Sequence, residues 1–134
     1  TLIQFSRSYI YTTALPPAVA AATLASLKIV RQESWRRDKL VQLVTRFRRG
    51  AEQIGLQLGA SNTPIQPVLI NNDAKVVQVG QSLRDAGFLV GAIRPPTVPV
   101  GTGRLRITFS ADHSEEQVDQ LVAALDSLNL RAAI

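Results

Sequence analysis

The segment Arg104–Phe109 (RLRITF) constrains the fold most, because its polar and apolar residues alternate without a break. Successive side chains of a β-strand point to opposite faces of the sheet. The three apolar residues therefore share one face, and Arg104, Arg106 and Thr108 share the other. Because an apolar face must be covered by another layer, the pattern predicts a sheet strand with helices packed against one of its faces.

An amphipathic helix follows this strand. Ser114 and Gln117 have the spacing of a capping box, in which two side chains accept hydrogen bonds from backbone N–H groups at the start of a helix. The apolar residues that come next recur at helical spacing and can cover the sheet: Val118, Leu121, Val122, Leu125 and Leu128. This helix is the expected cover for the strand.

Earlier parts of the chain supply the other elements. The patterns predict, in order, an extended segment over residues 5–13, a helical stretch from Pro17 to Leu58 that bends near residues 32–35, a strand over Ile65–Ile70, a helix capped by Asn72 or Asp73 and closed by Gly87, and a strand over Phe88–Ile93. Pro67 places the first of these strands at an edge or gives it an unpaired position. The fold class is therefore α+β, with a long helix followed by a small, mainly antiparallel sheet covered by helices.

Composition limits the possible functions. With 134 residues, 46% of them apolar, the chain can form one compact domain with a single core. It has no cysteine and only one histidine, His113, so disulfides, thiolate metal sites and histidine clusters are excluded, and no metal site is expected. We expect a cytoplasmic protein, and the start at Thr1 without a secretion signal suggests a piece of a longer chain. The Ala-rich run Ala14–Val30 contains two prolines and Lys28 and is not expected to span a membrane.

The basic charge of the chain raises the question of nucleic acid. The net charge is +5, and the basic residues gather within residues 34–50, at Arg36, Arg37, Lys39, Arg46, Arg48 and Arg49. Apolar residues in the same segment form one stripe of a helix, so the charges have the pattern of an ordinary solvated helix face. Few aromatic residues lie among the arginines, and no nucleic-acid-binding signature is present. A basic nucleic-acid-binding module remains an alternative.

The segment Gly91–His113 contains the strongest candidate for a ligand site. Arg94 lies among prolines that restrict the backbone, and the arginine-bearing face of the strand follows. Guanidinium groups bind carboxylates through two parallel N–H donors and keep their charge at neutral pH. The segment is therefore either a site for an anion or ordinary surface.

At this point four motifs resemble the carboxy-terminal part of a known family. They are YTTALPP (Tyr11–Pro17), IQPVLI (Ile65–Ile70), RDAG (Arg84–Gly87) and AIRPPTVPVGTGRLRITFSADH (Ala92–His113). In order and spacing they are similar to the α-oxoamine synthases, which depend on pyridoxal 5'-phosphate and have the aspartate-aminotransferase-like fold. The resemblance implies that residues 1–16 belong to the large cofactor domain and dimer interface. It also implies that residues 17–134, with the long interdomain helix, form the small carboxy-terminal domain of a fold-type I enzyme.

The resemblance also implies an activity. The family condenses an amino acid with an acyl thioester and releases carbon dioxide, and its members are acyltransferases. The motifs look most like those of the biotin-pathway branch, whose substrates are L-alanine and pimeloyl-CoA or pimeloyl-acyl carrier protein. Glycine C-acetyltransferase, 5-aminolevulinate synthase and serine palmitoyltransferase types remain alternatives within the family. The resemblance implies a homodimer, without a nucleic-acid or membrane partner.

Five residues match family positions that bind substrate or cofactor. Arg106 matches the strand arginine that pairs with the amino-acid carboxylate, and Arg94 matches a second active-site arginine. Thr97 lies in the same matched segment and is expected to line the substrate channel. Thr12 and Thr13 match the hydroxyl segment that reaches the cofactor phosphate of the neighbouring subunit. These roles are implied by the resemblance.

Other residues have ordinary structural roles in the same comparison. We expect a salt bridge with solvent exposure or at a domain interface for Arg104, and a loop or capping role for His113. Lys28, Lys39 and Lys75 lie on polar parts of predicted helices and do not match the lysine that carries the cofactor. That lysine precedes the matched segment in the family, so no catalytic residue is expected in this chain and the chain alone should be inactive. A noncatalytic partner subunit of the same fold is the remaining alternative.

Overall fold

The computed structural model describes residues 1–130. Contacts divide the chain into two compact units, Thr1–Ser34 and a second unit that begins at Trp35. The two units are described separately below. The expected assignment of residues 1–16 to a larger cofactor domain stays a prediction.

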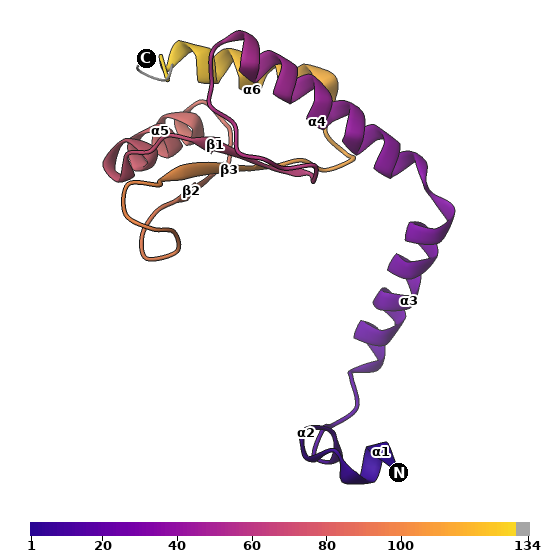
Figure 1. Cartoon of the computed structure of the whole chain (residues 1–134). Coiled ribbons are helices and arrows are strands. Elements are labelled where there is room, and N and C mark those ends of the chain that lie inside the picture. The colour runs from indigo at the N-terminus through magenta and orange to yellow at the C-terminus, as the bar shows by residue number, and fades with distance from the viewer. Residues whose placement is uncertain (131–134) are drawn as a thin grey trace. The chain divides into compact units, whose positions relative to one another are not determined.

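The first unit consists of two single-turn helices, α1 (Leu2–Phe5) and α2 (Arg7–Ile10), and the longer α3 (Pro17–Gln32) (Figure 1). The prediction of an extended segment over residues 5–13 is therefore wrong for α2 and for the start of the segment. The cause is local hydrogen bonding: the Phe5 N–H donates to the Thr1 carbonyl at 3.1 Å, and the Ile10 N–H donates to the Ser6 carbonyl at 2.9 Å. Because no described strand pairs with this segment, these turns satisfy its backbone groups.

The helix α3 begins at Pro17, as the sequence predicts, because proline suits the first helical position, where its missing N–H is not needed. No residue of α3 is buried. Several of its large apolar side chains are substantially exposed: Val19, Leu24, Leu27, Ile29 and Val30. α3 ends at Gln32 and α4 (Trp35–Gln53) begins at Trp35, so the helical stretch is interrupted where the sequence predicts a bend, near residues 32–35.

The second unit contains a sheet of three strands, β1 (Ile65–Leu69), β2 (Gly91–Ile93) and β3 (Arg104–Thr108). Their order is β1-β3-β2, and both pairings are antiparallel, which confirms the predicted sheet. The strand β2 begins later than expected because the Phe88 N–H donates to the Leu83 carbonyl at 2.8 Å and closes the preceding helix. The central strand β3, which carries the alternating segment, is paired on both sides.

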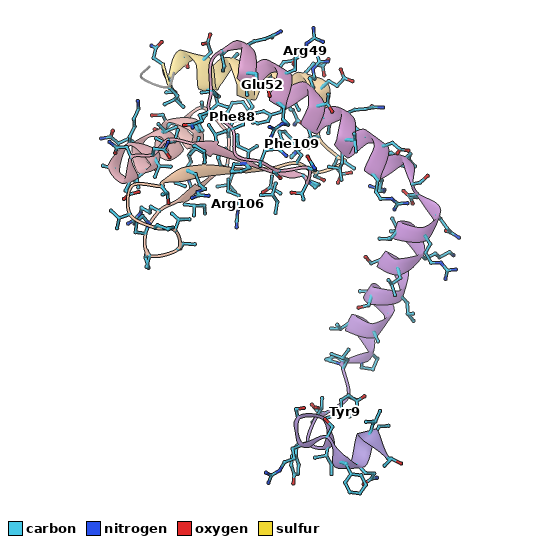
Figure 2. The ribbon with its side chains drawn as sticks, viewed as in Figure 1. Tyr9, Arg49, Glu52, Phe88, Arg106 and Phe109 are labelled. Atoms are coloured by element: carbon cyan, nitrogen blue, oxygen red, sulfur yellow. The ribbon has the colours of Figure 1, made fainter. Side chains whose placement is uncertain are left out.

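Helices α4 and α6 (Glu115–Ser127) pack together over one face of this sheet, and α5 (Asp73–Asp85) packs beside β2 and β3 (Figure 1). Leu105, Ile107 and Phe109 are buried as predicted. The Phe109 ring contacts that of Phe47 with a centroid distance of 5.3 Å. Figure 2 shows Phe109 on the side of the sheet that faces α4 and α6, and Arg106 on the opposite side. The two faces of β3 therefore have different environments.

Local signals fix the ends of the helices. Asn72 Oδ1 accepts from the Lys75 N–H at 2.9 Å, and Ser114 and Gln117 form the predicted capping box. The predicted end of the long helical stretch at Leu58 is wrong, because α4 already ends at Gln53. Gly55 has a positive φ of 77° and so stops the helix in a left-handed cap.

An ion cluster joins α4 to α6. Arg46 donates from Nε and Nη2 to the two carboxylate oxygens of Asp119, each at 2.7 Å, and from Nη1 to Glu115. The hydrogen bond from Arg46 is the main cause of a lowered Asp119 pKa, and the nearby positive charge of Arg46 acts in the same direction. The cluster is exposed to solvent, so its contribution to stability depends on pH and salt.

Replacing Phe47 with alanine should destabilise the second unit strongly. Phe47 has no exposed surface. Loss of a buried phenylalanine costs about 3–5 kcal/mol, because apolar contacts are lost and a cavity is left. Urea unfolding followed by circular dichroism measures this change. Val41→Ala is the matched control, because Val41 lies on the same helix but is 66% exposed; equal losses for the two variants would contradict the packing described here.

The contribution of Arg46 to stability should disappear in acid. Because the folded-state pKa of Asp119 lies below its ordinary value of 3.8, the ion pair contributes fully above that value, and the contribution is lost as the pH falls through the folded-state pKa. Arg46→Met should therefore unfold at a lower urea concentration at neutral pH, with the difference from the native protein shrinking below pH 3.8. Arg49→Met, on the same helix, is the control. A difference that persists unchanged into strong acid would contradict this account.

Candidate functional site

The candidate site lies at the connection between β2 and β3. Two tight turns build it: the Thr97 N–H donates to the Arg94 carbonyl at 3.1 Å, and the Thr102 N–H donates to the Pro99 carbonyl at 3.1 Å. The Thr102 hydroxyl also donates to the Pro99 carbonyl, at 2.7 Å. We call residues 94–103 the arginine loop. Its first residue, Arg94, follows directly after β2.

Arg106 lies on the open face of the sheet, away from α4 and α6 (Figure 2). Its side chain passes over Gly91, its register partner on β2: an ideal Cβ on Gly91 would lie 3.7 Å from Arg106 Nε. Arg106 lines an open hollow of ≈ 550 Å³ together with residues of α5, β2 and β3. No described residue forms an ion pair or hydrogen bond with its guanidinium group, so its N–H donors are available to an anion.

Arg94 is exposed and lines a second hollow, of ≈ 540 Å³, between the arginine loop and α5. Val77 of α5 lines both this hollow and that of Arg106. The two hollows are therefore neighbours, and the structure brings the two predicted arginines to adjoining places on one surface. Thr97 is exposed on the arginine loop but lines neither hollow.

The hollow of Arg106 is positively charged. Arg84 of α5 lines it as well, with Gln81 and Thr108, and the described lining contains no carboxylate. Arg84 was not singled out from the sequence. The sequence did contain a signal for Arg84: residues 77, 80 or 81, and 84 recur at helical spacing and therefore share one face of the helix. An anion in this hollow would meet two positive groups and an uncharged hydrogen-bonding wall.

Two nearby residues have structural roles. The salt bridge expected for Arg104 is not formed with any described residue; Arg104 Nε donates instead to the Thr102 carbonyl at 3.1 Å, because the loop carbonyl lies within reach of the side chain. His113 Nδ1 accepts from the Ser110 N–H at 3.1 Å, and its ring packs edge-on to Phe109. The loop role predicted for His113 is confirmed.

Thr12 and Thr13 belong to the first unit, and both are exposed. The Thr12 hydroxyl donates to the Ser8 carbonyl at 3.1 Å. Thr13 makes no hydrogen bond among the described residues. Its hydroxyl donor is therefore free, whereas that of Thr12 is already used.

The basic cluster on α4 makes several internal contacts. Besides the Arg46 cluster, Arg48 donates to Oε1 of the fully buried Gln66 at 2.7 Å and to the Gly59 carbonyl at 3.3 Å. These contacts were missed in the sequence, because neither partner is close to Arg48 along the chain. Since Arg46 and Arg48 already bind acidic or polar groups of the same chain, the cluster is not simply an open basic surface, which weighs against the nucleic-acid alternative.

Two further tests concern metals and membranes. Within residues 1–130, no group of three or more histidine, cysteine or acidic side chains is placed to hold a metal ion. None of the helices described in this range combines the length and apolar character that a membrane span requires.

Comparison with known proteins gives a consistent picture. The profile of the family described as aminotransferase class I and II matches residues 1–125. The 8-amino-7-oxononanoate synthase of Pseudomonas fluorescens is 59% identical over 93% of this chain and 32% of its own length. The enzyme of the same name from Hahella chejuensis is 56% identical, again over 93% of this chain and 32% of its own length. The chain thus spans about a third of the length of these curated relatives.

Solved structures show the same fold. The serine palmitoyltransferase of Sphingomonas wittichii matches with a TM-score of 0.87 and 32% identity, covering 95% of this chain and 32% of that one. The 8-amino-7-oxononanoate synthase of Francisella tularensis matches with a TM-score of 0.79 and 30% identity, covering 94% of this chain and 37% of that one. The second unit therefore has the architecture of part of a fold-type I enzyme.

The path of Arg106 over Gly91 can be tested by enlarging residue 91. Gly91→Ala should leave Arg106 in place, because the added Cβ would lie at ordinary contact distances of 3.5–3.7 Å. Gly91→Val should displace the guanidinium group, because its two further methyl groups need the space that the arginine side chain occupies. The Nε–H resonance of Arg106 in ¹⁵N NMR reports the change. If valine and alanine have the same small effect, Arg106 does not lie over Gly91.

Proposed function

Because this chain belongs to the class I and II aminotransferase family, we propose that it is the carboxy-terminal part of a pyridoxal-phosphate-dependent 8-amino-7-oxononanoate synthase. The complete protein would condense L-alanine with a pimeloyl thioester, release carbon dioxide and the thiol carrier, and form 8-amino-7-oxononanoate for biotin synthesis. The observation that carries the proposal is the unpaired Arg106 on the open face of a sheet that matches such enzymes.

Arg106 would bind the carboxylate of L-alanine. Its guanidinium group has no described ion pair to break, so binding costs only its desolvation and the ordering of one side chain. Two parallel N–H donors fit the two carboxylate oxygens and fix the orientation of the amino acid. Arg94, beside the neighbouring hollow, would add a second positive charge, and Thr97 would lie along the path to the site.

The residues of this chain fit a partial role in holding pyridoxal phosphate. Thr13 has a free, exposed hydroxyl that can donate to a phosphate oxygen, and we favour it over Thr12, whose donor is used by Ser8. None of the three lysines is buried, so the lysine that carries the cofactor would come from the remaining part of the protein. When bound, the cofactor supplies the electron sink that makes the α-carbon of the amino acid reactive.

The proposal includes properties of the complete protein that follow from the resemblance. These are a homodimer, in which the hydroxyl segment of one subunit serves the cofactor of the other, and a cytoplasmic location. The separate first unit, with apolar side chains exposed along α3, agrees with a segment that is covered in a larger assembly. The isolated chain would be inactive.

Related activities remain second choices. The solved serine palmitoyltransferases share the fold, but at 32% identity for the Sphingomonas wittichii enzyme against 59% for a curated 8-amino-7-oxononanoate synthase. Arg106, which has no described ion-pair partner, argues against a noncatalytic partner subunit, because such a subunit would not need a carboxylate-binding arginine. A cofactor-carrying lysine in the preceding part of the protein would separate these two cases.

The proposal predicts how substitutions of Arg106 affect the complete protein. A hydrogen bond to a charged group contributes about 1.5–3 kcal/mol, and tenfold in affinity corresponds to about 1.4 kcal/mol. Arg106→Lys keeps the positive charge but loses the two parallel N–H donors of the guanidinium group. It should therefore raise the KM for L-alanine by about 10- to 100-fold. The assay follows formation of 8-amino-7-oxononanoate from L-alanine and pimeloyl-CoA or pimeloyl-acyl carrier protein.

Arg104→Lys is the matched control, because Arg104 lies two residues away on the same strand and donates to a loop carbonyl. It should leave the KM for L-alanine within about threefold of the native value, which corresponds to less than 1 kcal/mol. Equal effects of the two substitutions would rule out a specific role for Arg106. A native protein that forms product from glycine or serine but not from alanine would move the assignment to a related enzyme.

A further inference from the structure

A carboxylate of α5 holds the end of the arginine loop. Asp73, the first residue of α5, accepts from the Gly101 N–H through Oδ2 at 3.1 Å. The neighbouring backbone is also tied, because the Ile70 and Asn71 N–H groups both donate to the Gly103 carbonyl, at 3.0 and 2.9 Å. The bond from Gly101 is the one that connects the loop to a side chain of α5.

The second oxygen of this carboxylate is buried against Gly103. Asp73 Oδ1 is fully buried and has no described hydrogen-bond partner. An ideal Cβ on Gly103 would lie 2.9 Å from it, and 3.3 Å from both the Asn72 carbonyl oxygen and Asp73 Cα. A side chain at residue 103 would therefore push the carboxylate away. Because a buried polar oxygen without a partner costs free energy, the placement of this carboxylate calls for an explanation.

The position of Asp73 suggests that explanation. Asp73 and Arg94 line the same hollow, together with Val77 and Val100, yet they form no ion pair. Asp73 thus contacts the far end of the loop through Gly101 and leaves Arg94, at the other end, unpaired. A rigid loop loses less conformational entropy when its arginine binds a ligand than a mobile loop does.

We propose that Asp73 is a positioning residue that latches the arginine loop to α5 and thereby presents Arg94 to the substrate carboxylate. Gly103 is the second part of the latch, because only a residue without a side chain lets the carboxylate reach Gly101. The inference rests on the proposed function for the identity of the substrate, whereas the latch itself is a property of the described residues. Asp73 acts through Arg94 and does not touch substrate.

The first experiment measures the latch in the complete protein by hydrogen exchange. Asp73→Ala should raise exchange at the Gly101 and Thr97 amides by about 10-fold, the effect of losing one hydrogen bond of about 1.4 kcal/mol. Asp73→Asn keeps an acceptor oxygen and should stay within about threefold of the native rates. Exchange in β3 and α6 should not change. Unchanged exchange at Gly101, or an increase spread over the whole second unit, would overturn the latch.

The second experiment measures its consequence for substrate. Asp73→Ala should raise the KM for L-alanine by about fivefold, equivalent to about 1 kcal/mol, without changing the KM for the pimeloyl thioester. Asp73→Asn should restore most of the loss. Glu116→Ala, which replaces an exposed acidic residue in the first turn of α6, is the control and should leave both constants unchanged. Equal increases of the two KM values would indicate a general structural effect and overturn the positioning role.

A double-mutant cycle tests whether Asp73 and Gly103 act through one contact. Gly103→Ala should loosen the loop although Asp73 is intact, and combining it with Asp73→Ala should add little to loop exchange. Fully additive effects would show that the two residues act independently. If the native protein forms no product from L-alanine, the proposed function fails, and the exchange measurements still decide whether the latch exists.

Discussion

In the described structure, β3 has one buried face and one open face, and the position of the candidate site depends on this difference. The strand is paired on both sides, and its apolar residues are buried beneath α4 and α6. Because side chains alternate along a strand, this burial forces Arg106 onto the opposite, open face. A shift of register by one residue would bury two arginines and expose the apolar residues of β3. Burial of the apolar core of the second unit therefore fixes the register of the strand, and with it the position of Arg106.

The rest of the candidate site is built around this fixed point. The β2 strand brings Gly91 under the arginine side chain, and α5 supplies the wall of its hollow. The arginine loop then carries Arg94 to the neighbouring hollow, where Asp73 ties it to the start of α5. The guanidinium groups of Arg84, Arg94 and Arg106 have no described partners and lie around two neighbouring hollows, an arrangement suited to binding a small carboxylate with a defined orientation.

Sequence patterns predicted those features that local interactions determine. The alternation of β3, the capping box at Ser114 and the interruption of the helix before Trp35 depend on residues close together in the chain, and all three are present. The single-turn helices α1 and α2 are also local, but they were missed because neither has a side-chain cap and their apolar residues also fit an extended segment. The latch between Asp73 and Gly101 was missed because its residues are far apart in sequence and meet only when α5 packs beside the sheet.

The central claim is that Arg106 recognises the carboxylate of an amino acid. The most direct measurement compares the affinity of the complete, cofactor-loaded protein for L-alanine with its affinity for L-alaninamide, which lacks the carboxylate charge. The native protein should prefer L-alanine by at least about 10-fold, as expected for one charge-assisted contact, and Arg106→Ala should lose most of this preference, with the remainder due to Arg94. A preference of the native size in Arg106→Ala would contradict the account.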